Sequence, residues 1–298
     1  MPSLKDLRKR IGSVKNTQQT TKAMKMVSAA KLRRAQESIV GNRPYALNVG
    51  RLIQLVSTMA DQTVTSPLVN PEGHGKPQNE RKVLLVVVTS DRGLCGAFNG
   101  SVIKKTEAWI KANKDAYADI RLAFVGRKGN DALKNRYPDR IESYSEFGPK
   151  ATFKTAKDLT DKLIAKFESG EIDEVKFVYN EFKNAITQIL QVEDFLPVRE
   201  SPFGHAGKAE DVDLYMTRPD AGELLKRLIN RHFAIQAFRV LLESQASEHG
   251  ARMASMDNAT KNAGEMIASL TLEYNKSRQA SITKELLEIT SGAEALKG

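Results

Sequence analysis

The sequence predicts an α/β protein with long helices, in which the N- and C-terminal helices form an antiparallel coiled coil around an inserted α/β domain. A heptad pattern near each end of the chain predicts the coiled coil. A continuous β-branched run between them, followed by alternating helix and strand patterns, predicts the inserted domain. We place an N-terminal coiled-coil helix at 1–60, a linker at 61–81, the α/β domain at 82–210 and a C-terminal coiled-coil helix at 211–298.

The N-terminal helix is predicted from apolar residues spaced alternately by three and four positions. Ser3 is suited to cap it, and the helix is expected to run to about Met59 with interruptions at Gly41, Pro44 and Gly50. The stripe begins with Leu4, Leu7, Ile11 and Val14. This spacing keeps one face of the helix turned toward a partner. A segment rich in proline and glycine follows and predicts the linker.

The α/β domain is predicted from alternating strand and helix patterns. The run Val83–Val88 is typical of a strand buried on both faces, and a turn at Ser90–Gly93 leads from it into a helix. This helix is expected to end at about Ala112. The further elements are a strand at Ile120–Val125, a helix near Asn130–Tyr137, a helix at Thr155–Phe167, a strand at Glu174–Tyr179 and an antiparallel strand at Ile186–Val192. Such alternation predicts a mainly parallel, Rossmann-like sheet with flanking helices.

The C-terminal helix is predicted to begin near Pro219 and to end at about Ser291. Its seam in steps of seven is Leu228, Ile235, Leu242, His249, Met256, Ala263 and Leu270. Antiparallel pairing with the shorter N-terminal helix leaves about 25 Å of this helix without a partner, at 1.5 Å per residue. Because that end carries Ile282, Leu286, Leu287 and Ile289, we expect another protein to cover it.

Polar residues interrupt both seams and allow two interpretations. They are Gln18, Thr21, Lys25 and Ser28 on the first helix, and Gln245, His249 and Arg252 on the second. Polar seam residues can fix the register of a coiled coil at a cost in stability. Alternatively, these turns face outward and contact another protein. The sequence leaves both interpretations open.

Most of the excess positive charge lies on the first helix. The chain has a formal net charge of +10, and residues 1–35 contain ten basic side chains and a single acid, Asp6. A solvated helix face is one explanation. Self-repulsion along so many turns also indicates an acidic partner, either nucleic acid or an acidic protein collar. The segment lacks the serine-rich composition of a removable mitochondrial presequence and runs directly into patterned helix.

Motifs for catalysis or cofactor binding are not evident. The chain lacks the G-x-x-x-x-G-K-[ST] motif, and the spacing of Gly93, Gly96 and Gly100 is not that of a dinucleotide fingerprint, so we expect them to shape a turn. Its four histidines lack metal-ligand spacing, and the lone Cys95 is expected to be a small buried residue in a reducing compartment. No apolar run is long enough for a spanning helix. We therefore expect no catalytic, cofactor or metal site.

Three segments resemble the γ subunit of F-type ATP synthases, the central stalk of the F1 sector. They are T-T-K-A-M-K-M-V-S-A-A-K-L-R-R-A-Q at Thr20–Gln36, S-D-R-G-L-C-G-A-F-N at Ser90–Asn99, and Y-N-K-S-R-Q-A-S-I-T-K-E-L-L-E-I-T-S-G-A at Tyr274–Ala293. The likeness covers essentially the whole chain, including the order of helix, α/β domain and helix. A lone Cys95 cannot reproduce the cysteine pair of the redox loop in some chloroplast relatives, so the chain looks bacterial.

The resemblance implies a non-catalytic rotor without a bound cofactor. It would transmit rotation of a membrane ring to the catalytic hexamer and thereby couple ion flow to ATP synthesis or hydrolysis. The implied partners are the α and β subunits of the hexamer, the ε subunit and the c-ring, with one copy of this chain per complex and no nucleic acid. The implied location is peripheral, on the cytoplasmic face of the bacterial inner membrane. The C-terminal tip would sit in a sleeve of the hexamer, and the α/β domain would be the foot at the ring.

The resemblance also implies the residues that contact partners. Those expected to face the acidic loop of the catalytic subunits are Lys22, Met24, Lys25, Lys31 and Arg34. Those expected at the C-terminal contact with the hexamer are Arg278, Gln279, Thr283 and Glu285, with Glu248 and Arg252 forming a polar catch lower on the shaft. Tyr215 is expected in the foot, near ε and the ring.

The sequence leaves open two alternatives to the rotor function. A basic coiled-coil protein that binds nucleic acid would bind DNA or RNA with steep salt dependence, but would leave the bare C-terminal end unexplained. An independent α/β enzyme with helical arms would show turnover or nucleotide binding by itself, and no motif supports it.

Overall fold

The structure is a computed structural model that describes residues 3–59, 68, 76–184, 187–197 and 221–295. The chain forms two compact units, which are described separately. The helical unit comprises residues 1–28 and 252–298. The α/β unit comprises residues 29–251 and therefore includes parts of both long helices.

Helix α1 is continuous from Leu4 to Met59. Ser3 caps it as predicted, because its hydroxyl oxygen accepts a hydrogen bond from the backbone N–H of Asp6 at 3.2 Å. The predicted interruptions at Gly41, Pro44 and Gly50 are wrong. An interior proline costs about 3 kcal/mol in a helix, but the turns that follow bury Val49, Ile53 and Val56 in the main core. This tertiary packing offsets the local cost.

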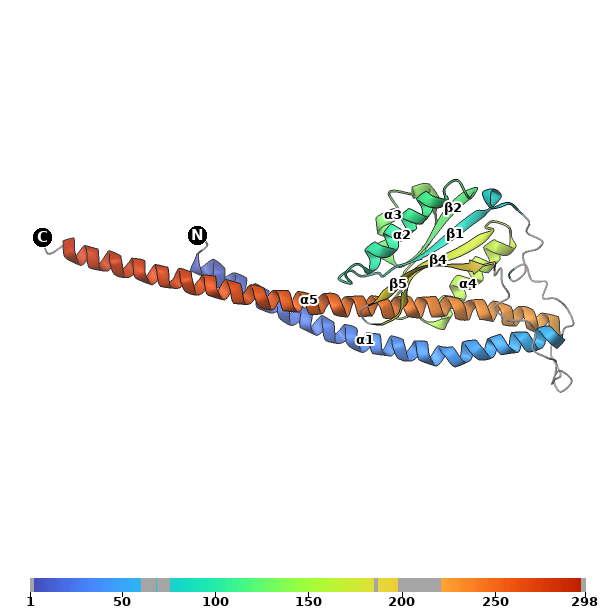
Figure 1. Ribbon diagram of the computed structural model, residues 1–298, viewed down its shortest axis with the longest axis horizontal. Helices are drawn as coiled ribbons and strands as arrows, with labels where there is room; N and C mark the ends of the chain where they lie inside the picture. Colours follow the sequence, from blue (N-terminus) through green and yellow to red (C-terminus); the bar gives the residue numbers. More distant parts are fainter. Residues whose placement is uncertain (1–2, 60–67, 69–75, 185–186, 198–220, 296–298) are drawn as a thin grey trace. The chain divides into compact units, whose positions relative to one another are not determined.

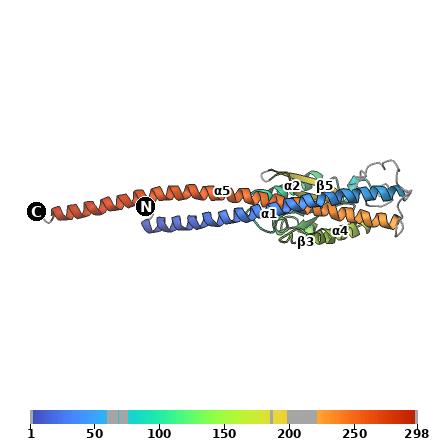
Figure 2. The ribbon, with the colours of Figure 1, turned by 90° about the horizontal axis from the view of Figure 1, so that it is seen from below.

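Helix α5 runs from Ala221 to Ala295, four residues beyond the predicted end. Its predicted seam is confirmed, because every one of the seven positions from Leu228 to Leu270 is buried or half-buried. The α1 stripe is confirmed in the same way, with Leu7 fully buried. Within each unit, α1 and α5 lie side by side and antiparallel (Figure 1 and Figure 2). The coiled coil of the two terminal helices is therefore present.

A five-stranded sheet forms the centre of the α/β unit, in the order β3-β2-β1-β4-β5. Its strands are β1 (Lys82–Val88), β2 (Asp119–Val125), β3 (Ile141–Ser145), β4 (Glu174–Phe182) and β5 (Gln188–Leu196). All neighbours pair in parallel except β4 and β5, which are antiparallel as predicted. The mainly parallel, Rossmann-like architecture is confirmed.

Helices cover both faces of this sheet (Figure 1). They are α2 (Phe98–Asn113), α3 (Arg127–Leu133) and α4 (Phe153–Glu168), with short 3₁₀ helices at Gln78–Glu80 and Pro138–Arg140. Alternate residues of β1 enter two cores, Val83 and Leu85 on the side of α2 and α3, and Leu84 and Val86 on the side of α4, α1 and α5. The prediction of a strand buried on both faces is confirmed.

The sequence-based prediction missed β3 and misplaced α3. Residues 141–145 read I-E-S-Y-S, and most of them are exposed because β3 is the edge strand of the sheet. Strand β3 therefore lacks the apolar run that marks a central strand. Helix α3 begins three residues before the predicted start at Asn130, directly after Gly126, and ends at Leu133. The proposed domain boundaries at 60, 81 and 210 stay predictions, and most of the linker lies outside the described residues.

Asp173 joins the starts of β1 and β4, and we expect its replacement by asparagine to destabilise the α/β unit. One carboxylate oxygen accepts a hydrogen bond from the Lys76 ammonium at 2.8 Å and the other from the Lys82 backbone N–H at 2.9 Å. Burial alone would raise the pKa of Asp173, but these hydrogen bonds together lower it below its ordinary value. Charged hydrogen bonds of this kind contribute about 1.5–3 kcal/mol each.

The effect of Asp173→Asn should depend on pH with a definite sign. Because the pKa of Asp173 is lowered in the folded chain, the stabilisation is present above the unfolded pKa near 4 and is lost as pH falls through the folded value. Urea unfolding at several pH values should therefore show the largest destabilisation at neutral pH and a shrinking one in acid. Asp161→Asn, in an exposed pair with Lys157, is the matched control and should change little. A pH-independent loss would contradict this role for the Asp173 carboxylate.

Candidate functional site

Polar seam residues of the helical unit form hydrogen bonds between α1 and α5. The Thr260 hydroxyl donates to the hydroxyl oxygen of Thr21 at 2.8 Å, and the Gln18 amide lies 3.5 Å from the Thr260 carbonyl oxygen. Lys25 donates to Asp257 at 2.6 Å. Ser28 is 3% exposed. These contacts fix the register of the two helices, so the outward-facing interpretation of Gln18 and Thr21 is wrong.

Lys25 contacts α5 and remains accessible. Its side chain is 43% exposed. Asp257, which was not among the predicted contact residues, also forms an ion pair with Lys261 at 3.1 Å. Hydrogen bonds from Lys25 and Lys261 lower the pKa of Asp257. The position of Asp257, directly after the seam residue Met256, is the sequence signal that could have identified it as the partner of Lys25.

The remaining predicted contacts of α1 include three exposed cations. Lys22, Lys31 and Arg34 are exposed, and none of them forms an ion pair with another described residue. Lys22 belongs to the helical unit, whereas Lys31 and Arg34 belong to the α/β unit. Met24 is half-buried beside Lys25. The three cations are thus available to an acidic partner.

The predicted C-terminal contacts lie on an exposed stretch of α5. Arg278, Gln279, Thr283 and Glu285 are all exposed. The Thr283 hydroxyl donates to the Gln279 carbonyl oxygen at 3.0 Å, and Glu285 accepts from the Ser281 hydroxyl at 3.2 Å. The apolar side chains of this stretch are also exposed: Ile282 by 45%, Leu286 by 58%, Leu287 by 61% and Ile289 by 68%. Within the helical unit, α5 continues beyond the start of α1 (Figure 1 and Figure 2).

The structure does not bring all predicted contacts to one surface. Glu248 is half-buried and Arg252 is 9% exposed, which limits their access to a partner in this conformation. Tyr215 lies outside the described residues. Gln245, a polar residue of the α5 seam within the α/β unit, is 6% exposed, and its amide oxygen accepts a hydrogen bond from the Ala151 backbone N–H at 3.4 Å. The outward-facing interpretation of Gln245 is wrong.

The segment Ser90–Asn99, at the carboxyl end of β1, is held to neighbouring segments of the α/β unit by hydrogen bonds. The carboxylate of Asp91 accepts from the backbone N–H groups of Arg127, Phe147 and Gly148 at 2.9, 3.2 and 2.8 Å. In parallel α/β sheets this edge commonly binds ligands. Here the Asp91 side chain instead links its own loop to the start of α3 and to the loop after β3.

Cys95 lies in the same segment and is buried as predicted. Its side chain is 2% exposed, and its sulfur accepts a hydrogen bond from the Asn99 amide at 3.2 Å. Leu94 and Gly96 both have positive φ, 62° and 56°, so the turn is tight where glycine was expected to shape it. The described residues contain no group of three or more His, Cys, Asp or Glu side chains that could hold a metal ion. None of the described helices is long and apolar enough to cross a membrane.

The chain has an antiparallel pair of long terminal helices, an α/β domain inserted between them in sequence, and an exposed apolar helix end. These features define a stalk protein. A family model described as ATP synthase matches residues 3–296. The chain is 46% identical to the ATP synthase gamma chains of Anaeromyxobacter sp. (strain Fw109-5) and Geobacter metallireducens, and covers 100% of each chain in both comparisons. It belongs to the ATP synthase gamma-chain family.

Solved structures agree with this fold. The Tetrahymena thermophila mitochondrial ATP synthase central stalk and c-ring structure contains a chain with 27% identity and a TM-score of 0.58, and the match covers 80% of this chain and 99% of that one. A chain of the Euglena gracilis mitochondrial ATP synthase, 21% identical, matches with a TM-score of 0.65 over 98% of this chain and 94% of that one, which shows the fold. The comparisons give no support to the nucleic-acid-binding alternative.

Proposed function

We propose that this chain is a non-catalytic shaft that transmits rotation of a membrane ring to a catalytic hexamer. The observation that carries the proposal is the exposed apolar end of α5, which runs on beyond the start of α1 within a chain of this family. Exposed leucine and isoleucine side chains in sequence favour burial in a partner. A sleeve formed by the α and β subunits of the hexamer fits this requirement and the polar residues Arg278, Gln279, Thr283 and Glu285 beside it.

The proposed contacts along α1 are electrostatic and reversible. Lys22, Lys31 and Arg34 are exposed cations without ion pairs among the described residues, and Lys25 keeps part of its side chain in solvent. Exposed ion pairs contribute roughly 0–1 kcal/mol each. Such contacts with an acidic loop of the catalytic subunits can form and break during each step of rotation. Glu248 and Arg252 would join them after a local rearrangement of α5.

We further propose that the α/β domain is the foot, with Tyr215 near the ε subunit and the c-ring. The chain would lie at the periphery of the bacterial inner membrane, on the cytoplasmic face, with one copy per complex. The bacterial gamma chains at 46% identity support this location. The ion that drives the ring is determined by other subunits.

Affinity purification of the tagged chain from its host membranes in mild detergent tests these partners. We expect one copy of the chain for three copies of each hexamer subunit, together with ε and the ring subunit, and ATPase activity in the isolated material. Recovery of the chain alone, or with nucleic acid that salt removes, would contradict the proposal.

Met24→Lys is expected to impair coupling more than assembly. The added ammonium would lie beside Lys25, on the face proposed to pass the acidic loop. One extra exposed ion pair of about 1 kcal/mol would slow the step that breaks it roughly five-fold. Proton or sodium pumping driven by ATP should therefore fall by about that factor in membrane vesicles, while the complex still assembles and hydrolyses ATP.

Met26→Lys is the matched control for Met24→Lys. Met26 is 60% exposed and is not among the residues proposed to contact the acidic loop. Its replacement should leave pumping and hydrolysis in their normal ratio. Normal pumping in the Met24→Lys variant, or equal losses in both variants, would refute the assignment of this face.

A further inference from the structure

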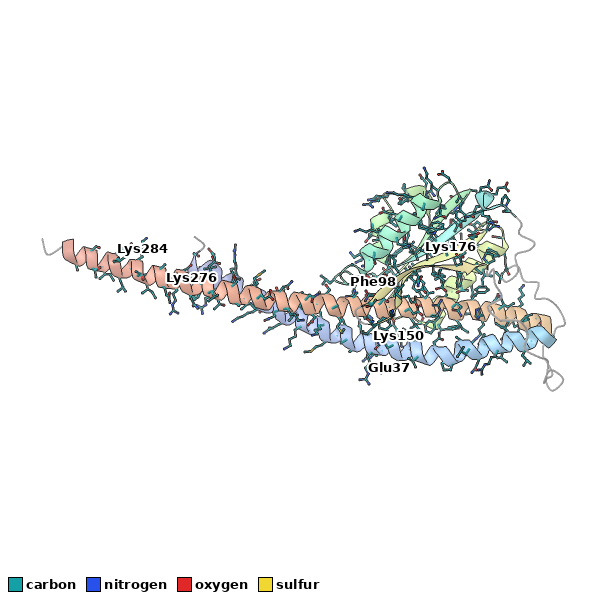
Figure 3. The ribbon with its side chains drawn as sticks, in the orientation of Figure 1. Glu37, Phe98, Lys150, Lys176, Lys276 and Lys284 are labelled. Carbon is teal, nitrogen blue, oxygen red and sulfur yellow. The ribbon has the colours of Figure 1, made fainter. Side chains whose placement is uncertain are left out.

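A cavity of about 500 Å³ lies within the α/β unit, between α1, residues 149–150 and α5. Its volume is within the range of sites that bind small molecules. Lys31 and Arg34 contribute from α1, Lys150 from the segment before α4, and Gln245 from α5. Figure 3 labels Lys150, which lies beside the two long helices.

The charges that line this cavity favour an anion. Lys31, Arg34 and Lys150 are exposed cations, and none of them forms an ion pair with another described residue. Glu37 is the acid of the lining, and its carboxylate is already paired with Arg33 at 3.1 Å. The lining therefore carries three cations and one carboxylate, with a net charge of +2. A ligand with about two negative charges would balance it.

The segment that carries Lys150 is fixed from both sides. Asp91 binds the backbone N–H groups of Phe147 and Gly148, and Gly148 has a φ of +79° at the turn. The Gln245 amide spans the other side, 3.5 Å from the Pro149 carbonyl oxygen and 3.4 Å from the Ala151 nitrogen. These contacts hold the backbone on both sides of Lys150 in place, so a binding site would be largely preformed.

We propose that this cavity binds a phosphate-type anion, with Arg34, Lys31 and Lys150 as its ligands. A phosphate group carries about −1.5 to −2 charge at pH 7 and offers several acceptor oxygens. The planar guanidinium of Arg34 matches two of these oxygens, and the lysines act as point charges. The aromatic ring of the described lining is that of His249, which is 7% exposed and therefore offers little surface for stacking on a nucleobase. Inorganic phosphate or pyrophosphate therefore fits the site better than a nucleotide does.

Titration of the purified full-length chain with phosphate, pyrophosphate and ATP at low salt tests this site, with calorimetry and phosphorus NMR line widths as readouts. We expect saturable binding of one anion per chain, with pyrophosphate bound more tightly than ATP. Arg34→Gln and Lys150→Gln should each weaken binding roughly ten-fold, as expected for a charged hydrogen bond. Glu37→Gln should tighten it by about a factor of three, because it removes the carboxylate of the lining.

Lys104→Gln is the matched control, because Lys104 is an exposed lysine on α2 that has no ion pair among the described residues and does not line the cavity. Unchanged binding in this variant, with the losses above, would support the site. If ATP binds more tightly than pyrophosphate, the same cations bind the phosphate chain of a nucleotide, and the preference for inorganic phosphate or pyrophosphate is wrong. Binding that does not saturate, or that falls equally in Lys104→Gln, would overturn the proposal. Because the assay uses the chain alone, its outcome is independent of the proposed torque contacts, which share Lys31 and Arg34.

Discussion

Gly126→Ala is expected to lower the free energy of unfolding of the α/β unit by about 3–5 kcal/mol. Gly126 has a φ of +104°, a backbone conformation that is strained for any residue with a Cβ atom. A Cβ atom built there would lie 2.0 Å from the backbone carbonyl oxygen of Thr89. The obstacle is main chain at the end of β1, which cannot rotate away. The strand ends of β1 and β2 would have to separate.

Urea unfolding followed by the fluorescence of Trp109 measures this loss. Trp109 is the single tryptophan of the chain and lies on α2, 5.6 Å from the ring of Tyr117 between centroids, so it reports on the α/β unit. Gly100→Ala is the control with the opposite expected sign. A Cβ there meets nothing within 4 Å, and alanine inside a helix is favoured over glycine by about 0.5–1 kcal/mol. Equal free energies of unfolding for the two variants would refute this role of Gly126.

Arg239→Gln is expected to destabilise the same unit by about 2–3 kcal/mol, because it leaves carboxylates of a half-buried network without their cation. Arg239 on α5 forms an ion pair with Glu193 on β5 and lies 3.3 Å from Glu243. It also donates to the Tyr179 hydroxyl oxygen at 3.2 Å, and Tyr179 donates to Glu193 at 2.6 Å. The network joins α5 to two strands of the sheet.

The loss in Arg239→Gln should be smaller in acid. Burial raises the pKa of Glu243 even though Arg239 opposes it, and removal of the cation would raise this pKa further. A carboxyl group with a raised pKa stabilises the folded chain relatively more as pH falls. The stability deficit should therefore be larger at about pH 8 than at about pH 5.

Arg227→Gln provides the matched control for Arg239→Gln, since Arg227 pairs with Glu223 four residues away on the exposed face of α5. It should cost only about 0.3–0.5 kcal/mol. A deficit of similar size in the two variants would show that the network contributes little.

The long-range periodic features of this fold could be predicted from the sequence. The α5 seam was predictable because a heptad repeat from Leu228 to Leu270 keeps the same face buried throughout. Strand β1 was predictable because a strand buried on both faces is apolar at every position. Strand β3 was not, since residues 141–145 lie at the sheet edge and need no apolar run. The continuity of α1 through Pro44 depends on tertiary packing.

The candidate contacts were only partly predictable. Lys22, Lys31 and Arg34 were expected as contacts from the family resemblance; the structure leaves them exposed, and their contact with a partner stays a prediction. The roles of Asp91 and Gln245 could not be read from the sequence. The backbone groups that they bind are distant along the chain, such as Gly148 for Asp91 and Ala151 for Gln245.

Rotation of a probe attached to the chain tests the central claim most directly. Lys104→Cys on the exposed face of α2 supplies an attachment point, and the native Cys95 is 2% exposed and should not react. With the purified complex fixed to a surface through its hexamer, we predict that the probe turns in one direction while ATP is hydrolysed and stops when ATP is withheld. A probe that stays still during continued hydrolysis would contradict the assignment of this chain as the rotor.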